Sequence, residues 1–451
     1  MPAFSQDNSP YSRYGIGDLV PASNINIRGM GGISAAYADF LSVNFNNPAS
    51  YSAFQSFIES KSKRLISGRA VLDVGLNFES HTLQESNPPR KFATGNALFS
   101  YVQVGLPLKQ NWGMSFGLRP VSRISYKIFN RQMLKDPNTG LPIDSALTRF
   151  EGTGGTYLAS VGTGFALIDK NKAGGKMKER LSFGVNAGYL FGKKDYSTKR
   201  SLYAPGDTVI YYQGNFESRT TYGSLYFTAG LQYMVPVDTT KRITLGLGAY
   251  GNWGQKVNAS QDILRETFVF DDNLGDVRLD SVYDQKDVKG KIVLPSSFTV
   301  GFIFQKPMIM EKDRRESGWT IGADFTMQNW SKYRVFGQAD SVRNRWELRI
   351  GGQLTPVPNK NYFSNITYRA GFFMGPDYIK VGKNLPNIGG SFGMGLPVAL
   401  NRQAPNQFTI INIALEYNKR GTTSNLLRES LFRFSLGFSL SDAWFGKRKY
   451  D

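Results

Sequence analysis

The chain alternates apolar and polar residues with a period of two over much of its length. In residues 431–441, LFRFSLGFSLS, every second residue from Phe432 to Leu440 is Phe or Leu, and the residues between them are Arg433, serines and a glycine. Residues 181–192 and 319–328 alternate in the same way. A period of two places successive side chains on opposite faces of a sheet, so these segments are predicted to be amphipathic β-strands.

The same pattern, less regular in places, predicts fourteen strands. Many of them reach ten residues or more, whereas strands in soluble proteins average about 5–6 residues and a tilted membrane-spanning strand needs about 9–11. An even number of long amphipathic strands predicts an all-β membrane protein, a 14-stranded antiparallel transmembrane β-barrel. The segments lie near residues 67–83, 91–109, 111–130, 149–168, 180–196, 218–235, 241–258, 290–305, 317–331, 344–356, 361–374, 388–398, 407–419 and 429–441.

The less apolar face of these strands is rich in Gly, Ser, Thr and Asn. In a soluble β-sandwich, which is the alternative, this face would lie in water and would more typically carry Lys, Glu and Thr. Small residues suit a crowded lumen, and charges of both signs allow ion pairs across it, which favours the barrel. The charges on this face are Asp73, Arg119, Asp324, Glu347, Arg349, Arg369, Glu416 and Arg433.

The links between the predicted strands alternate in length. Short links at 108–111, 235–240, 356–360 and 399–406 alternate with long ones at 131–148, 197–217, 259–289 and 375–387. Outer-membrane barrels have short periplasmic turns and long outer loops, so both termini are predicted to be periplasmic. The barrel would span residues 67–441, followed by a basic and aromatic periplasmic tail at 442–451. The longer charged links 169–179 and 306–316 are candidates for contacts with periplasmic partners.

The first 66 residues lack the strand pattern. Residues 1–6 are interpreted as the remnant of a signal peptide or an added start, and residues 7–66 as a partly helical plug, or hatch, in the lumen. Within the plug, Asn47 suits a helix N-cap and Pro48 the first helical position.

The stretch from Gly29 to Phe54, GMGGISAAYADFLSVNFNNPASYSAF, resembles the hatch of the FadL-type outer-membrane transporters of hydrophobic compounds. The shared features are the glycine-rich opening, the AYAD stretch and the Asn-Pro-Ala turn, and the whole chain resembles FadL-like proteins of Bacteroidota. The resemblance implies a fourteen-stranded barrel, capture of ligand by outer loops, a lumen site above the hatch, and exit through a kink in the third strand. It marks Gly31, Gly32, Phe45, Asn47, Pro48, Ala49 and Tyr51 as candidate ligand or hatch residues.

The third strand, 111–130, contains Pro120, which removes a ladder hydrogen bond. This predicts either a kink that opens a passage or an ordinary bulge. Arg119, Arg123 and Lys127 are expected to alternate on the lumen side, where they would hold an anionic head group or neutralise hatch carboxylates such as Asp39. Apolar residues on the lumen face either form a pocket above the hatch or pack the hatch itself: Val121, Leu190, Tyr226, Tyr250, Ile303, Trp330 and Phe408.

Composition narrows the chemistry. The net charge is +19, but the basic clusters are spread over links and no nucleic-acid motif accompanies them, so nucleic-acid binding is not predicted. The chain has no Cys and a single His, His81, expected to be exposed near the outer end of the first strand. Neither an enzyme, nor a cofactor, nor a metal site is predicted, and the acidic loop 270–276 is interpreted as solvated rather than calcium-binding.

Two functions remain open. One is a passive outer-membrane transporter of hydrophobic or amphipathic, long-chain fatty-acid-like molecules. The outer loops lack an evident apolar helix for ligand capture, which counts against a fatty-acid ligand and favours the alternative. The other is a non-transporting barrel subunit of an outer-membrane secretion or barrel-assembly complex. The expected partners are a hydrophobic small molecule, lipid or detergent in the lumen, outer-membrane lipid and lipopolysaccharide, and, for the second function, a larger envelope complex.

Overall fold

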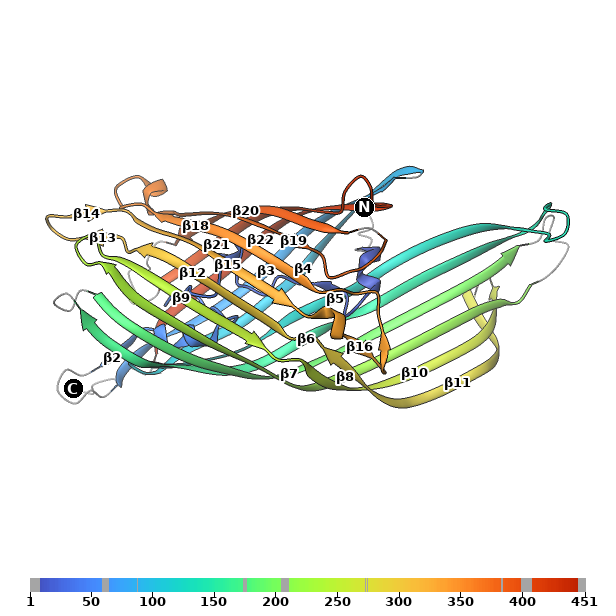
Figure 1. Ribbon diagram of the computed structural model, residues 1–451, viewed down its shortest axis with the longest axis horizontal. Coiled ribbons are helices and arrows are strands. Elements are labelled where there is room, and N and C mark those ends of the chain that lie inside the picture. The colour runs from blue at the N-terminus through green and yellow to red at the C-terminus, as the bar shows by residue number, and fades with distance from the viewer. Residues whose placement is uncertain are drawn as a thin grey trace.

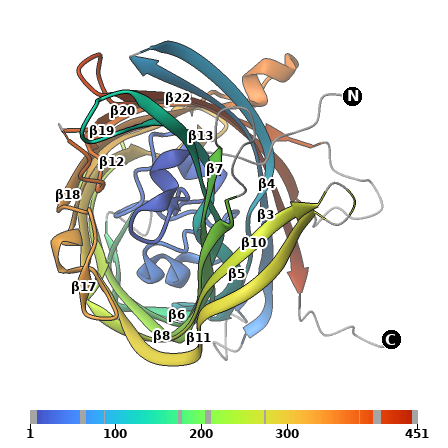
Figure 2. The same ribbon diagram turned by 90° about the vertical axis from the view of Figure 1, so that its right-hand side faces the viewer.

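A closed antiparallel barrel encloses the N-terminal part of the chain (Figures 1 and 2). The computed structural model describes residues 9–58, 65–86, 88–172, 177–203, 211–271, 273, 275–382, 384–398 and 408–444. Within these residues, no helix has the length and apolar character needed to cross a membrane.

The barrel wall has fourteen strands among the described residues, two of which are each divided by a short break. Each strand pairs with the next, and β22 closes the ring on β3 from Leu427↔Glu85 to Trp444↔Gly68. The predicted 14-stranded barrel is therefore confirmed, and each of the fourteen predicted segments overlaps a strand. The wall consists of β3 (Leu65–Ser86), β4 (Pro89–Lys109), β5 (Trp112–Lys135), β6 (Pro142–Lys172), β7 (Met177–Tyr203), β8 (Gln213–Asp238), β9 (Ile243–Asn252) continued by β10 (Gln255–Asp271), β11 (Gly275–Leu294) continued by β12 (Ser297–Lys306), β15 (Gly318–Gln328), β18 (Arg345–Thr355), β19 (Thr367–Pro376), β20 (Pro386–Pro397), β21 (Phe408–Arg420) and β22 (Leu427–Trp444).

The wall is much taller on one side than on the other. β6 has 31 residues, whereas β19 has 10, and Figure 1 shows β5 to β8, β10 and β11 running far past the other strands. The prediction that residues 131–148, 197–217 and 259–289 form long loops is wrong, because most of these residues continue the strands. We call the projecting sheet the extension; it comprises residues 126–135, 142–152, 196–203, 213–218, 263–271 and 275–285.

The plug lies inside the ring, shown in blue in Figure 2. Its elements are η1 (Pro10–Arg13), β1 (Asp18–Leu19), α1 (Ile25–Arg28), η2 (Pro48–Ala53) and β2 (Ser56–Ile58), and β2 pairs with the start of β3. Residues 7–8 and 59–64 of the predicted hatch lie outside the described residues. At the other end of the chain, β22 continues to Trp444 rather than ending at residue 441, and residues 445–451 of the predicted tail also lie outside the described residues.

Two of the links fold into structure of their own. The link between β12 and β15 forms the hairpin β13 (Ile309–Met310) and β14 (Arg315–Glu316). The link between β15 and β18 contains η4 (Trp330–Lys332), β16 (Arg334–Val335) and β17 (Gln338–Ala339), and β16 pairs with β11. A further short helix, η5 (Tyr362–Asn365), precedes β19.

A candidate lumen site beside an interrupted strand pair

The elbow of the plug, residues 44–54, is held tightly against the wall. The side chain of Asn47 accepts a hydrogen bond from the backbone N–H of Ala49 (3.1 Å), as the predicted N-cap should, although the helix it caps is a 3-10 helix. Its amide nitrogen donates to the carbonyl oxygens of Ala35 (2.6 Å) and Leu231 (3.2 Å). Asn47, Pro48, Ala49 and Tyr51 are buried, and none of them lines a described cavity.

Wall glycines make this close approach possible. A Cβ atom on Gly184 would lie 2.3 Å from the carbonyl carbon of Pro48, and one on Gly164 would lie 2.2 Å from the Pro48 carbonyl oxygen. Such contacts are shorter than van der Waals distances, so any side chain there would push the elbow away from the wall. The Asn-Pro-Ala turn therefore anchors the plug.

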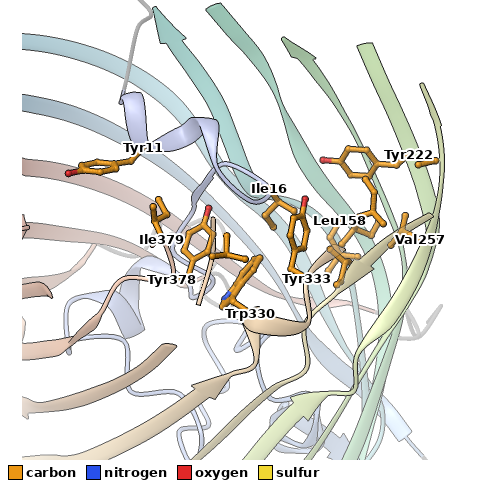
Figure 3. Close-up of a cluster of buried hydrophobic side chains, with 14 of the residues drawn as sticks. Tyr11, Ile16, Leu158, Tyr222, Val257, Trp330, Tyr333, Tyr378 and Ile379 are labelled. Atoms are coloured by element: carbon orange, nitrogen blue, oxygen red, sulfur yellow. The ribbon is translucent and has the colours of Figure 1, made fainter. Parts of the chain in front are cut away.

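A cap of buried aromatic side chains covers the N-terminal segment of the plug on the side of the extension (Figure 3). Aromatic side chains from η4 and from the link between β19 and β20 pack against the N-terminal segment of the plug. Tyr333 donates a hydrogen bond to the carbonyl oxygen of Gly15 (2.9 Å), and Tyr378 donates to those of Tyr14 (3.1 Å) and Gly17. Burial raises the pKa of both tyrosines well above the ordinary value, so they remain neutral donors.

Below the cap lies a largely apolar cavity of ≈ 200 Å³. It is bounded by the cap, the plug residue Phe45 and the wall. Arg119 lines it and has no ion-pair partner among the described residues; its guanidinium carbon lies 5.5 Å from the centre of the Phe45 ring. Of the residues predicted for the site, the cavity brings together Phe45, Arg119, Val121, Leu190, Tyr226, Tyr250 and Trp330.

A second cavity of ≈ 210 Å³ is lined mainly by charged side chains. Arg420 is its hub, because it forms ion pairs with Asp18 (2.9 Å), Asp377 (2.9 Å) and Glu429 (3.0 Å). Arg28, which is 2% exposed, forms a buried ion pair with Glu416. The charges around this cavity compensate one another. The ion pairs between them join the plug to β21 and β22.

The third barrel strand, β5, is only partly paired with β4. Their ladder runs from Lys109↔Trp112 to Val102↔Leu118 and stops there, two residues before Pro120. Beyond this point the plug strand β1 pairs with β5 instead, through Leu19↔Ser122 and Asp18↔Arg123. The barrel wall is thus interrupted between β4 and β5 beside the plug.

A bulge at Pro120 changes which side chains face the lumen. Pro120 pairs with Tyr157 and Ser122 with Thr156, which leaves Val121 as an extra residue. One extra residue reverses the alternation of the strand. Arg119 and Arg123 each border a lumen cavity, whereas Lys127 lies on the outward face, so the prediction for Lys127 is wrong.

Arg123 and Lys127 lie differently from Arg119. Arg123 also borders the charged cavity, and its guanidinium donates to the carbonyl oxygen of Phe99 on β4, across the interruption. Lys127 forms an outward ion pair with Glu151 (3.3 Å).

The remaining predicted residues lie elsewhere. Ile303 is 1% exposed and packs against the plug in a cluster with Ile33 and Ala36, so it belongs to hatch packing. Phe408 is 41% exposed at the far end of β21, where it contacts Arg69, and it borders neither described cavity. Gly31 (φ +69°) and Gly32 (φ +90°) form a left-handed turn that borders the charged cavity.

His81 is buried rather than exposed. Its Nδ1 lies 2.6 Å from Glu429 and its Nε2 lies 3.3 Å from Glu79. It thus belongs to the charged network that holds the plug. No group of three or more His, Cys, Asp or Glu suited to a metal occurs among the described residues, and residues 272 and 274 of the acidic loop lie outside them.

Several residues of the site were missed from the sequence. Tyr333, Tyr378 and Arg420 lie in or beside links, where no periodic pattern marks a residue as buried. The N-terminal stretch SPYSRYGIGDL carries two tyrosines and three glycine or serine turns in eleven residues, which was the available signal that this segment is packed.

The profile of the BamG family matches residues 1–451. The chain belongs to the BamG family. No curated protein matches it.

Among solved structures, the chain is similar to a FadL homologue from Pseudomonas aeruginosa, with 13% identity, a TM-score of 0.49, and coverage of 95% of this chain and 100% of that chain. The toluene transporter TodX of Pseudomonas putida gives 13% identity, a TM-score of 0.46, and coverage of 95% and 99%. The monoaromatic hydrocarbon channel CymD gives 12% identity, a TM-score of 0.46, and coverage of 96% and 99%.

The expected FadL-like type is confirmed, and this BamG-family chain is an outer-membrane β-barrel.

Proposed function

We propose that this BamG-family barrel is a passive transporter of hydrophobic or amphipathic small molecules of the long-chain fatty-acid-like type. The observation that carries the proposal is the position of the apolar cavity. It borders Arg119 and Val121 on β5, next to the point where the β4–β5 ladder stops. A ligand leaving this cavity sideways would therefore meet a break in the wall rather than a continuous sheet.

The residues of the cavity suggest how such a ligand would be held. The apolar side chains of Val121, Leu190 and Trp330 would contact its hydrocarbon part. Arg119 is not neutralised by a carboxylate among the described residues, so it would bind an anionic head group. In this proposal the extension and cap face outward and both termini are periplasmic. The N-terminal segment of the plug, which occupies the interruption, would have to shift to release the ligand.

A disulfide across that segment tests the proposal. Leu19 and Ser122 are direct cross-strand partners, so cysteines at both positions lie within the range that a disulfide spans. The chain has no other cysteine. We expect oxidation of the L19C/S122C pair to reduce uptake of a fluorescent long-chain fatty acid into proteoliposomes at least tenfold, and a reductant to restore it.

The matched control is the pair A370C/F392C, which joins β19 to β20 away from the interruption and should leave uptake unchanged. Equal uptake by the oxidised and reduced L19C/S122C protein would contradict passage through this point. Absence of uptake by the unmodified protein would contradict transport altogether.

A second candidate function is that of a non-transporting subunit of an envelope complex. It is favoured by the extension, which no membrane-spanning role requires, and by the cap, which packs on the N-terminal segment of the plug within the lumen. It predicts co-purification with a large partner after mild detergent extraction of native membranes. A barrel that migrates alone in that experiment would count against it.

A further inference from the structure

We propose that the concave face of the extension binds an extended, acidic segment of a partner polypeptide. This inference goes beyond transport and would stand even if the lumen carried nothing. It names a binding surface for the second candidate function.

One row of side chains crosses the whole extension from edge to edge. The row follows the strand register through successive cross-strand partners: Ile128, Phe150, Thr198, Phe216, Arg265 and Tyr283. Phe216 is 50% exposed and Tyr283 is 37% exposed. Six strands are separated by five spacings of about 4.8 Å, so the row is about 24 Å long, which matches about seven residues of extended chain.

The row faces the axis of the barrel. The guanidinium carbon of Arg13, in the plug, lies 4.9 Å from the centre of the Phe150 ring. The hydroxyl of Tyr196, two residues before Thr198 on the same face of β7, donates to the carbonyl oxygen of Arg13 (3.1 Å). Membrane lipid surrounds the outside of a barrel, so these rings are not part of its lipid-facing band.

The charges on the two faces of the extension differ. On the outward face, and just below the extension on the same side of the wall, several basic residues have carboxylate partners, as in Lys127–Glu151 (3.3 Å) and Arg219–Asp195 (3.4 Å), although Arg131 has none among the described residues. On the concave face, Arg13, Arg200 and Arg265 have no carboxylate partner among the described residues.

The acidic residues of the concave face, Asp144 and Asp280, lie toward its outer rim, where Asp144 accepts a hydrogen bond from Tyr211 (2.5 Å). The face therefore combines exposed rings with uncompensated positive charge.

This combination indicates the chemistry of the occupant. Apolar side chains of a partner would contact Phe150, Phe216 and Tyr283, and its carboxylates would pair with the free guanidinium groups. Arg265 already lies over the Tyr283 ring at 5.3 Å, which holds its guanidinium in place. On the edge of β11 that faces away from β10, Ile292 and Val293 pair with β16, and the carbonyl oxygen of Lys291 accepts from Phe336 N (3.0 Å). Within the described residues, positions 275–285 have no strand partner on this edge, so they offer free backbone groups beside the row.

Two fluorescent heptapeptides test the proposal against the full-length protein in detergent. One alternates Glu with Phe, and the other alternates Lys with Phe. We expect fluorescence anisotropy to show binding of the acidic peptide, weakening with salt, and at least tenfold weaker binding of the basic peptide. The double substitution F216S/R265E should weaken binding of the acidic peptide at least tenfold.

The control carries the same two changes on the opposite face, F129S/R131E. Phe129 is 58% exposed and Arg131 is exposed without a carboxylate partner among the described residues. This variant should bind the acidic peptide within twofold of the unmodified protein, and both variants should keep the thermal transition of the barrel.

Three results would overturn the proposal: no binding of the acidic peptide, equal binding of the basic peptide, or an equal loss in the control variant. Displacement of the peptide by a neutral oligosaccharide would instead indicate a glycan site and would also overturn it.

Discussion

The two parts of the plug are attached to the barrel in different ways. The elbow, residues 44–54, is buried against wall glycines, and the side chain of Asn47 forms hydrogen bonds with three backbone groups. The N-terminal segment, residues 9–20, instead lies along the free edge of β5. It is held by backbone hydrogen bonds such as Ser9 N to Ser125 O (3.2 Å) and Val20 N to Val121 O (3.0 Å), by the Asp18–Arg420 ion pair (2.9 Å), and by the tyrosines of the cap.

This difference indicates which part can move. Displacing the elbow would expose closely packed surface and leave buried amides without partners, at a high cost in free energy. Displacing the N-terminal segment would break its hydrogen bonds to β5 and the cap and the Asp18–Arg420 ion pair, but it would not disturb the glycine contacts of the elbow, and the wall is already interrupted there. If anything passes through this barrel, the N-terminal segment would move while the elbow stays in place. Four substitutions test this contrast.

The largest effect is expected from Arg28→Met, which removes a cation that fixes the plug. Arg28 pairs with Glu416 and donates to Asn77 (2.8 Å) and Ser435 (2.9 Å). Removing one partner of a buried ion pair costs about 3–5 kcal/mol of unfolding free energy. Because Arg433 also lies beside Glu416 and still compensates its charge in the variant, we expect a loss near the lower value. Guanidinium unfolding followed by tryptophan fluorescence should show the loss, whereas Lys332→Met, at an exposed cation, should not. An unchanged midpoint for Arg28→Met would contradict a rigidly fixed plug.

A smaller effect is expected from Gly184→Ala at the elbow. The added Cβ would lie 2.3 Å from the Pro48 carbonyl carbon, which is backbone and cannot rotate away. Overpacking of this kind costs about 1–3 kcal/mol. Gly95→Ala is the control, because its Cβ would meet only the Glu79 carbonyl oxygen at 3.7 Å. If both variants unfold at the same denaturant concentration, the elbow has more room than the structure indicates.

The barrel itself could be predicted from the sequence because its signal is repeated. Each strand pattern is weak alone, but fourteen of them at regular spacing define a closed sheet. The lumen pocket could be predicted for a related reason: residues such as Leu190 and Tyr226 are apolar on an otherwise polar face. The height of the extension was missed because its strands lack a regular alternation of apolar and polar residues, so residues such as those of 259–289 resemble a loop.

The errors at the site have local causes. The outward position of Lys127 depends on a bulge, and a proline predicts a bulge without saying how many residues it adds. His81 was interpreted as exposed because its burial depends on Glu429, which lies 348 residues further along the chain. Ion-pair networks between distant strands have no pattern in the sequence. The part of the site formed by β-strand periodicity was therefore predictable, and the part formed by links and bulges was not.

The third substitution, Tyr378→Phe, tests the attachment of the N-terminal segment. It removes the hydroxyl that donates to the carbonyl oxygens of Tyr14 and Gly17. A lost hydrogen bond costs about 1 kcal/mol, which corresponds to about a fivefold increase in local opening. Maleimide labelling of an Ile16→Cys reporter should speed up by that factor, while an Ala49→Cys reporter in the elbow stays protected.

Tyr368→Phe serves as the control for the loss of a hydroxyl, because its partner, Phe363, lies in the link that precedes β19. Equal acceleration at positions 16 and 49 would show that the plug opens as one unit and would remove the contrast between its two parts.

The smallest effect is expected from Arg123→Ala, which removes the side chain that bridges β5 to the Phe99 carbonyl oxygen on β4. This hydrogen bond is exposed, so its loss should cost only about 0.5 kcal/mol and raise labelling of Ile16→Cys about twofold. Arg131→Ala, further along β5, should have no effect. The comparison with Tyr378→Phe is informative in itself, because the two substitutions act on opposite sides of the N-terminal segment. If Arg123→Ala accelerated labelling more than Tyr378→Phe, the bridge across the interruption, rather than the cap, would be the main restraint on the segment.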